Sequence, residues 1–227
     1  MIAPEKVQLS APRKYLGWTL TNTIVTPQKL QLNTKIETPD DAQRLLGDLQ
    51  WLRPVVGIPN KLLESLRPLL QGTDLAQPVT VTMQHKRLLQ QIMDCIIHGS
   101  VRRRDPDLPI QVIVWYGPKY LLGALAQSKK KTGEVWVLEW ICPSLQQSKT
   151  LLQKTELLAE VIKKGRERTL QITGMEPVCV QLPMQKDTLT WYVQHSPELQ
   201  DAGDIASLQP MIRAHCKHWS WWPLYAP

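Results

Sequence analysis

Three residues, Gln43, Gly47 and Trp51, have a spacing that places unusual side-chain chemistry on one side of a helix. At about 100° per residue they share one face, while the opposite face carries a core-facing leucine stripe: Leu45, Leu46, Leu49 and Leu52. Glycine costs about 1 kcal/mol relative to alanine inside a helix, so a glycine beside an outward tryptophan needs an explanation. Glycine permits close approach, the indole offers a flat apolar face, and glutamine donates and accepts hydrogen bonds. The combination suits a nucleic-acid minor groove; the alternative is that another domain covers this face and Trp51 belongs to a core.

The acidic residues do not form a recognisable catalytic set. Asp40 and Asp41 are the only adjacent aspartates, and their place at an expected helix start favours capping over Mg²⁺ binding. Glu156 and Glu160 are expected on a solvated helix face, in ion pairs of the i,i+4 kind. The segment His215–His218 contains residues that could bind zinc, but the sequence offers no distant second pair of ligands to complete a site, and no Cys-x-x-Cys occurs. We therefore expect no catalytic residue, metal site or cofactor in this chain.

The charge of the chain favours an anionic partner. Its 227 residues include 27 Lys+Arg and 20 Asp+Glu, a formal net charge of +7. Two basic clusters are candidates for phosphate contacts: Arg102, Arg103 and Arg104, and Lys129, Lys130 and Lys131. A third runs from Lys163 to Arg168. Each cluster alone is better explained as a solvated turn or helix end, but together with a groove-tracking helix they could follow one duplex with salt-dependent affinity.

The helix that carries the three residues is expected to belong to a small three-helix bundle. Thr38, followed by a proline and two acids, predicts its start, and the helix should weaken before Pro54. Further helices are expected over 60–71, with a kink or early end at Pro68, and over 83–98. A hairpin or small meander over 7–32 precedes them, and Gly17 within it indicates a bulge or the close approach of another backbone or a ligand.

The second half is expected to be an α/β unit. Strands over 110–115, 120–125 and 135–140, a helix over 149–164, and strands over 168–173 and 177–182 are predicted, and we interpret this half as a βββαβ unit. The expected fold class is therefore α+β: an N-terminal β-hairpin, a helical bundle and an α/β unit. The expected domains cover residues 1–35, 36–104 and 105–200, and an irregular tail covers 201–227.

Several segments resemble retroviral reverse transcriptases, in the same order, and endogenous betaretrovirus-like polymerases most of all. Asp41–Pro59 resembles the first thumb helix with the loop after it, and Leu69–Gly72 resembles the end of the next helix. Tyr15–Trp18 resembles the primer-grip hairpin, and Pro27–Lys29 fits the linker between palm and thumb. Two further segments resemble the connection domain, whose fold is RNase H-like: Val137–Trp140 and Leu182–Lys186.

The resemblance implies roles for individual residues. Gln43, Gly47 and Trp51 match the minor-groove track that contacts template–primer behind the active site. The grip that holds the primer terminus is matched by a second set: Tyr15, Leu16, Gly17 and Trp18. Asp48 stands where some relatives carry lysine, and we leave it outside the site because it would repel phosphate. The implied partners are an RNA–DNA or DNA duplex, the remaining polymerase domains and, in a dimer, another polymerase subunit.

The catalytic parts that the family uses are missing from this sequence. Polymerisation requires carboxylates that hold two Mg²⁺ ions, partly in a Tyr-x-Asp-Asp turn of a palm that would precede Met1, and no such turn occurs here. The first strand of the RNase H-like half, Ile110–Trp115, contains no acid that could join Glu139 and Glu156. We therefore expect a fragment of an RNA-directed DNA polymerase that grips and guides template–primer but is inactive alone, with Mg²⁺ and RNase H activity belonging to the parent protein.

Three rival interpretations stay open. The chain could be an interaction module that packs against another subunit through the tryptophans of its second half: Trp115, Trp136, Trp140 and Trp191. It could be an RNase H-like hydrolase if Glu139, Glu156 and an aspartate converge within reach of a metal. It could also be a degraded reading frame without function. The absence of a long apolar run and of a secretory signal leads us to expect an intracellular location, in the cytoplasm or a viral particle.

Overall fold

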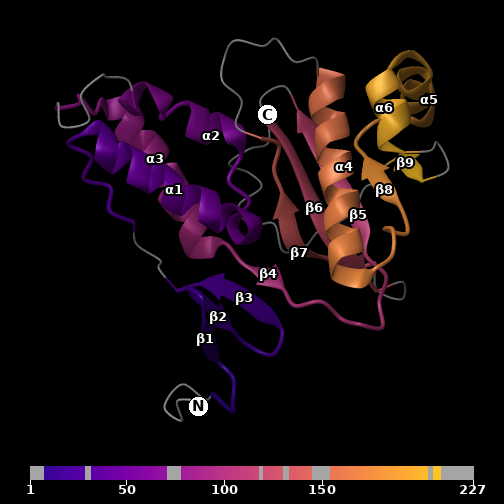
Figure 1. Cartoon of the computed structure of the whole chain (residues 1–227), viewed down its shortest axis with the longest axis horizontal. Helices are drawn as coiled ribbons and strands as arrows, with labels where there is room; N and C mark the ends of the chain where they lie inside the picture. The colour runs from indigo at the N-terminus through magenta and orange to yellow at the C-terminus, as the bar shows by residue number, and fades with distance from the viewer. Residues whose placement is uncertain are drawn as a thin grey trace.

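The computed structural model describes residues 8–28, 32–70, 78–117, 120–129, 133–144, 154–203 and 207–210. The fold is α+β, as predicted, and has three parts: a four-stranded sheet, a group of helices, and a five-stranded sheet flanked by further helices (Figure 1). Within the described ranges, no helix is both long enough and apolar enough to cross a membrane. The predicted domain boundaries stay predictions.

The N-terminal hairpin is part of a four-stranded antiparallel sheet. Its strands are β1 (Arg13–Tyr15), β2 (Trp18–Leu20), β3 (Ile24–Pro27) and β4 (Val101–Arg102). Strand β4 arrives from beyond the helices and pairs its buried Val101 with Val25. The sequence did not predict β4, because two residues carry no periodic pattern of their own. This pairing attaches the hairpin to the rest of the chain.

The helical group consists of α1 (Pro39–Val56), α2 (Asn60–Glu64), the 3₁₀ helix η2 (Arg67–Leu70) and α3 (Met83–His98). The helix predicted over 83–98 is confirmed. So is the start of α1, where Thr38 and Asp41 form a reciprocal capping box. As expected, the second helix ends early, and Pro68 lies in η2 instead of a continued α-helix.

The prediction that α1 weakens before Pro54 is wrong. The helix continues to Val56, and Gly57, at φ 68°, closes it by donating its N–H to the carbonyl of Arg53. A proline in the last turn removes one hydrogen bond. The burial of Val55 and Val56 supports this last turn.

The second half has the predicted βββαβ order. Strands β5 (Gln111–Gly117), β6 (Tyr120–Ser128) and β7 (Val135–Ile141) form an antiparallel meander, α4 (Lys154–Thr173) crosses over, and β8 (Val180–Leu182) pairs parallel to β5. Helices α5 (Lys186–His195) and α6 (Pro197–Ala202) then lead to β9 (Leu208–Pro210), which pairs parallel to β8. The sheet order is β7-β6-β5-β8-β9.

Two details of this half differ from the predictions. The expected strand over 168–173 is instead the end of α4, because Gly165 and Thr169 pack that turn of the helix against the sheet. Residues 208–210 were expected in an irregular tail, but Leu208 is buried and β9 completes the sheet edge. Tertiary packing outweighs local propensity in both places.

The five-stranded sheet separates two hydrophobic cores. One face packs against the α1–α3 group, and its core joins Leu49 and Ile92 of the helices to Trp115 and Trp140 of the strands. The other face is covered by α4, α5 and α6 (Figure 1). Helix α1 is therefore fixed on one side by the sheet, which leaves its opposite side available.

Candidate nucleic-acid interface

The outer face of α1 carries the three residues that the sequence singled out, which we call the α1 track: Gln43, Gly47 and Trp51. Gln43 and Gly47 are exposed, and Trp51 is 47% exposed. The opposite stripe is buried, with relative exposures of 4% or less: Leu45, Leu49 and Leu52. A Cβ placed on Gly47 would meet no other atom within 4 Å. The backbone there is open to an approaching partner.

The indole of Trp51 does not belong to the leucine core. It stacks on Trp18 of β2, with ring centroids 4.2 Å apart and ring planes 16° from parallel. Gly17 lies against the same ring, since a Cβ added there would be 2.7 Å from Trp51 Cη2. The sequence indicated a bulge or the approach of another backbone or a ligand at Gly17; the group that approaches is instead a side chain of the same chain, the tryptophan of the α1 track. The structure brings the track and the predicted grip hairpin together.

The hairpin tip is exposed and has an uncommon backbone. Leu16 and Gly17 have φ of 45° and 78°, the two positive angles of a type I′ turn between Tyr15 and Trp18. Positive φ is unfavourable for leucine, and the Leu16 side chain is 70% exposed, so packing does not explain the choice of residue. A strained, outward apolar tip is typical of a segment that contacts a partner.

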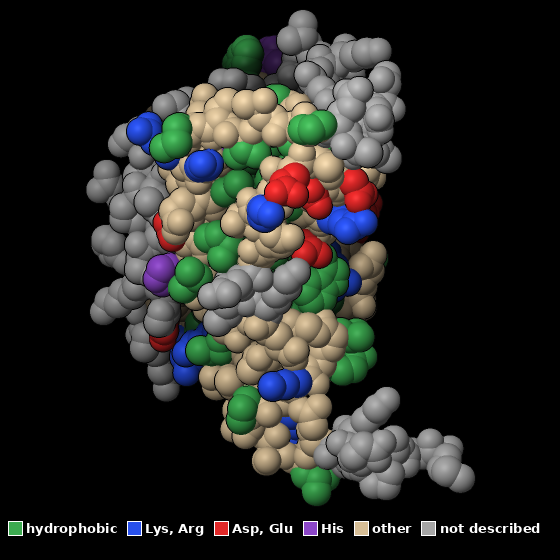
Figure 2. Space-filling view, turned by 90° about the vertical axis from the view of Figure 1, so that its left-hand side faces the viewer, with side chains coloured by type: hydrophobic (Ala, Val, Ile, Leu, Met, Phe, Trp, Pro, Cys, Tyr) green, Lys and Arg blue, Asp and Glu red, His purple; other side chains and the backbone are tan. Residues whose placement is uncertain are grey.

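The hairpin has the electrostatic character that a phosphate backbone requires. Residues 8–28 include Arg13 and Lys14 and no acidic residue. In Figure 2 the lower lobe, which is the hairpin, shows hydrophobic and basic side chains and no acidic ones on the visible face. An anionic strand that lies along α1 would therefore meet no repulsion from the described residues of the hairpin.

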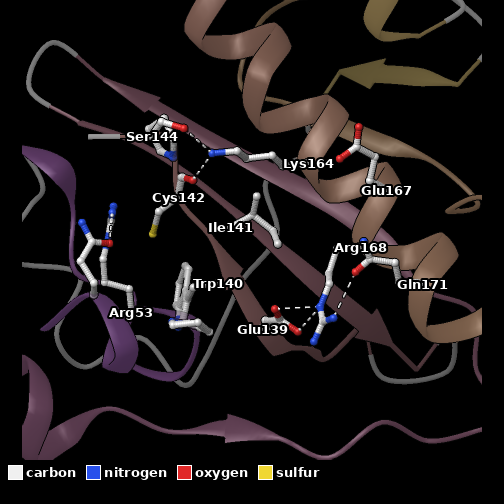
Figure 3. Close-up of a pocket in the computed structure, with 13 residues that line it drawn as sticks. Arg53, Glu139, Trp140, Ile141, Cys142, Ser144, Lys164, Glu167, Arg168 and Gln171 are labelled. Atoms are coloured by element: carbon white, nitrogen blue, oxygen red, sulfur yellow. Dashed lines mark hydrogen bonds and ion pairs between the residues drawn. The ribbon is translucent and has the colours of Figure 1, made fainter. Parts of the chain in front are cut away.

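Two adjoining open clefts continue from Trp51 toward the second half of the chain. The first, of about 470 Å³, is lined by Trp18, Trp51 and Val101 among others. The second, of about 580 Å³, lies between the end of α1, β7 and α4 (Figure 3). The two clefts share four lining residues: Gln50, Pro54, Glu139 and Arg168.

The charged groups of the larger cleft are already paired. Arg168 reaches from α4 to Glu139 of β7, with Nε 3.0 Å from both carboxylate oxygens (Figure 3). Lys164 forms the predicted i,i+4 ion pair with Glu160 at 2.7 Å. Burial acts to raise the pKa of Glu160, but hydrogen bonds from Lys164 and Ser144 outweigh it, and the pKa is lowered from its ordinary value.

The carboxylates do not form a metal site within the described residues. No group of three His, Cys, Asp or Glu side chains in these ranges could hold a metal ion. Glu139, one of the acids of the hydrolase interpretation, is instead bound by Arg168. The residues that the structure describes therefore do not fit the Mg²⁺ ions of a polymerase or an RNase H. His215–His218 lies outside them.

The basic clusters have different environments. Arg102 lies 5.0 Å from the centre of the Trp136 ring and 3.9 Å from Glu134, and the backbone of Glu134 accepts a hydrogen bond from Lys129. The Arg102–Arg104 cluster and the start of the Lys129–Lys131 cluster are thus side by side. Arg103 and Arg104 are exposed, whereas Lys130 and Lys131 lie outside the described residues.

The third cluster does not offer free charges. Its side chains are paired with acids from several elements: Lys163 with Asp201, Lys164 with Glu160, Arg166 with Glu176, and Arg168 with Glu139. Among the described members of the other two basic clusters, the exposed candidates are therefore Arg103, Arg104 and Lys129.

The tryptophans of the second half are mainly core residues. Trp115, Trp136 and Trp140 are at most 8% exposed, whereas Trp191 is 55% exposed and stacks on His195. Of the four tryptophans on which the interaction-module interpretation rests, only Trp191 is therefore exposed enough to contact a partner.

A polar joint between the two halves was not predicted. The buried Arg53 donates from Nε to the carbonyl of Ile58 at 3.0 Å and from Nη2 to Oδ1 of Asn60. Asn60 donates in turn to the carbonyl of Ser144 at 3.0 Å, and Ser144 Oγ donates to Glu160 at 2.6 Å. Asn60 and Ser144 are 84 residues apart, so no local pattern could reveal the joint.

Comparison with known proteins identifies two domains, in the order of the two halves. A reverse transcriptase thumb domain model matches residues 27–90, and an ERVK-8-like, RNaseH-like domain model matches residues 118–215.

Several viral polyproteins are similar to most of the chain. The Gag-Pro-Pol polyprotein of sheep pulmonary adenomatosis virus is 33% identical over 198 residues, which is 86% of this chain and 11% of the polyprotein. That of squirrel monkey retrovirus is 34% identical over 222 residues, with 92% and 12% covered, and that of simian retrovirus SRV-2 is 28% identical over 197 residues, with 86% and 11% covered. The chain therefore spans 11 to 12% of the length of these relatives.

Proposed function

The chain belongs to the retroviral reverse transcriptases, as their thumb and RNase H-like region, and from this we propose that it holds a template–primer duplex without performing the chemistry. The α1 track would lie in the minor groove, and the hairpin tip at Tyr15–Trp18 would hold the primer strand. The duplex would be RNA–DNA or DNA, because the track recognises a groove and a backbone, and both are present in either duplex.

One observation carries the proposal: the α1 track and the hairpin tip form a single exposed surface. They are far apart in sequence, yet Trp51 stacks on Trp18 and touches Gly17. A surface with open backbone at Gly47, a half-exposed indole and an amide side chain fits a groove better than it fits a protein core. The exposed Arg103, Arg104 and Lys129 supply candidate phosphate contacts on another edge of the same chain.

The chemistry of the parent polymerase would be performed outside the described residues. The carboxylates that bind Mg²⁺ and activate the primer terminus would belong to another part of the polyprotein, because Glu139 and Glu160 are held in ion pairs here. In this chain the residues bind and orient the duplex. Their contribution to the reaction is positional.

Binding of a fluorescently labelled RNA–DNA duplex to the 227-residue chain, followed by anisotropy, tests the proposal. We expect Trp51→Ala to weaken binding about tenfold, since stacking and groove contacts of an aromatic ring contribute roughly 1–3 kcal/mol. Gln43→Ala should weaken it less, and affinity should fall steeply with added salt. Trp191→Ala, which also removes a half-exposed indole, is the matched control and should bind normally. Equal affinities of the Trp51 variant and the parent would refute the track.

A contact role with other polymerase domains has a narrower basis. Exposed apolar side chains occur at the end of α4 and just after it: Leu170, Met175 and Val178. We propose this end of α4 as a place where the rest of the polyprotein or a second subunit packs, and the exposed Trp191 of α5 as a separate candidate contact. Sedimentation of the chain with and without duplex would separate this role from duplex binding.

A further inference from the structure

We infer that Trp18 is a positioning residue that holds the indole of Trp51 for the duplex, so that the hairpin and helix α1 present one preassembled contact surface. The inference rests on the proposed function of the α1 track. It assigns to Trp18 a role different from the primer contact that the resemblance implies, because the side chain acts through Trp51.

The stacking geometry limits what each ring can do. Trp18 and Trp51 are nearly parallel at 4.2 Å, so one face of the Trp51 indole is covered by Trp18. Trp51 nevertheless keeps 47% of its surface exposed, whereas Trp18 is only partly exposed within β2. Trp51 is therefore the ring that can meet a partner, and Trp18 is the support behind it.

The turn that carries Trp18 is built to bring the two rings together. At Gly17 any Cβ would lie 2.7 Å from Trp51 Cη2, and the φ of 78° is one that other residues rarely adopt. Gln28 fixes the two peptide groups that flank Trp18. Its backbone N–H donates to the Gly17 carbonyl and its Nε2 donates to the Trp18 carbonyl, each at 2.8 Å. Three residues outside the helix thus define the position of one side chain on it.

Stacking on Trp18 should lower the entropic cost of duplex binding. An unsupported indole on a helix surface samples several rotamers, and a partner must then select one at an entropic cost. Because the stack orders Trp51 beforehand, that cost is met during folding. The same stack transmits any displacement of the hairpin to the α1 track, so the two segments contact the duplex together.

A double-mutant cycle on the full chain tests the inference. Duplex affinity is measured for the parent, Trp18→Ala, Trp51→Ala and the double variant, with Trp18→Phe as the conservative replacement. We expect Trp18→Ala to weaken binding roughly threefold to tenfold in the parent and to have no effect when Trp51 is already alanine. Trp18→Phe should retain affinity within about twofold, since a second aromatic ring still supports the stack.

A spectroscopic readout accompanies the cycle. Neighbouring indoles couple their electronic transitions, and both Trp18–Trp51 and Trp115–Trp140 are close enough to do so. We therefore expect the circular dichroism couplet of the parent to lose the same part of its intensity in both alanine variants and to be unchanged in Trp191→Ala. Thermal unfolding of each variant shows whether the fold is intact.

The outcomes separate the inference from the proposed function. Equal losses from Trp18→Ala in the parent and in the Trp51→Ala background would mean that Trp18 contacts the duplex itself, which overturns the inference and leaves the track standing. Unchanged affinity of Trp51→Ala would overturn the track and the inference together. A couplet of full parental intensity in Trp18→Ala would show that the stack does not exist.

Discussion

At the scale of single residues, Gly47 and Gly17 show two different uses of a missing side chain. Gly17 makes room for an indole of the same chain, because a Cβ there would overlap Trp51. Gly47 faces open space on the exterior of α1 and has a negative φ, so neither packing nor backbone geometry explains it. Close approach of an external partner is the remaining physical reason for a residue that weakens its helix.

Close approach of a partner at Gly47 predicts that a substitution there has opposite effects on stability and on binding. Gly47→Ala should raise the free energy of unfolding by about 1 kcal/mol, because alanine is the better helix former and nothing obstructs its Cβ. The same methyl group should weaken duplex binding several-fold by holding the groove away from the helix. Chemical denaturation and anisotropy on one preparation measure both quantities.

The matched control for Gly47 is the same substitution in α4. A Cβ on the buried Gly165 would lie 2.9 Å from Val112 Cγ1, so Gly165→Ala should destabilise the chain by about 1–3 kcal/mol through overpacking. If the Gly47→Ala variant is more stable than the parent but binds the duplex equally well, Gly47 does not serve close approach to the duplex.

At the scale of elements, the joint between α1 and the five-stranded sheet fixes the track relative to the second half. Arg53 lies in the last turn of α1, Asn60 begins α2, and Ser144 follows β7, so one hydrogen-bonded chain connects three elements. Gly57 contributes by letting Trp140 approach, since a Cβ there would lie 2.7 Å from the indole. The helix that carries the α1 track is thereby attached to the RNase H-like fold.

Loss of the amide at Asn60 should destabilise the joint. Asn60→Ala removes the acceptor of Nη2 of the buried Arg53 and the donor to Ser144, and we expect a cost of about 1–3 kcal/mol in the free energy of unfolding. Lys61→Ala, one residue further along and exposed, should change stability little. A denaturation midpoint of the Asn60 variant equal to that of the Lys61 variant would show that the joint contributes nothing.

The same joint should be sensitive to acid. The pKa of Glu160 is lowered from 4.5, so its ionised form stabilises the fold above about pH 4.5, and this contribution is lost as the pH falls through the lowered pKa. Glu160→Gln should therefore lose less thermal stability than the parent between about pH 7 and pH 3.5. Glu167→Gln removes the same charge from an exposed position of α4 and serves as the comparison. Identical pH profiles of the two variants would contradict the assignment.

The sequence predicted the elements whose signals are local. The capping residues before α1, its leucine stripe and the bounds of α3 all follow from spacing, and the two-faced character of α1 follows from the same periodicity. The expected strand over 168–173 was wrong because three of its six residues are β-branched, among them Thr169 and Ile172, while the other three favour a helix, so local propensity does not decide between the two. The contact between Trp18 and Trp51, like the Asn60 joint, depends on packing between distant segments and could not be read from either segment alone.

At the scale of the whole molecule, the chain combines a fixed helix, an attached hairpin and a sheet whose two faces are both covered. Its net charge of +7 and a hairpin without acidic residues favour a polyanionic partner. The basic side chains of α4 are already held in ion pairs, so this helix is a poor site for phosphate. The surface that remains for a duplex begins at α1 and the hairpin tip. The RNase H-like half then serves as the support that orients α1.

Site-directed photocrosslinking tests the central claim most directly. A benzophenone amino acid placed at Gln43, on the outer face of α1, should crosslink to a labelled RNA–DNA duplex, and the crosslink should disappear when unlabelled duplex competes. The same group at Gln194, exposed on α5 at the far side of the sheet, should give none. Equal crosslinking from both positions, or none from Gln43 at a duplex concentration that saturates binding, would contradict the assignment of this helix face to the duplex.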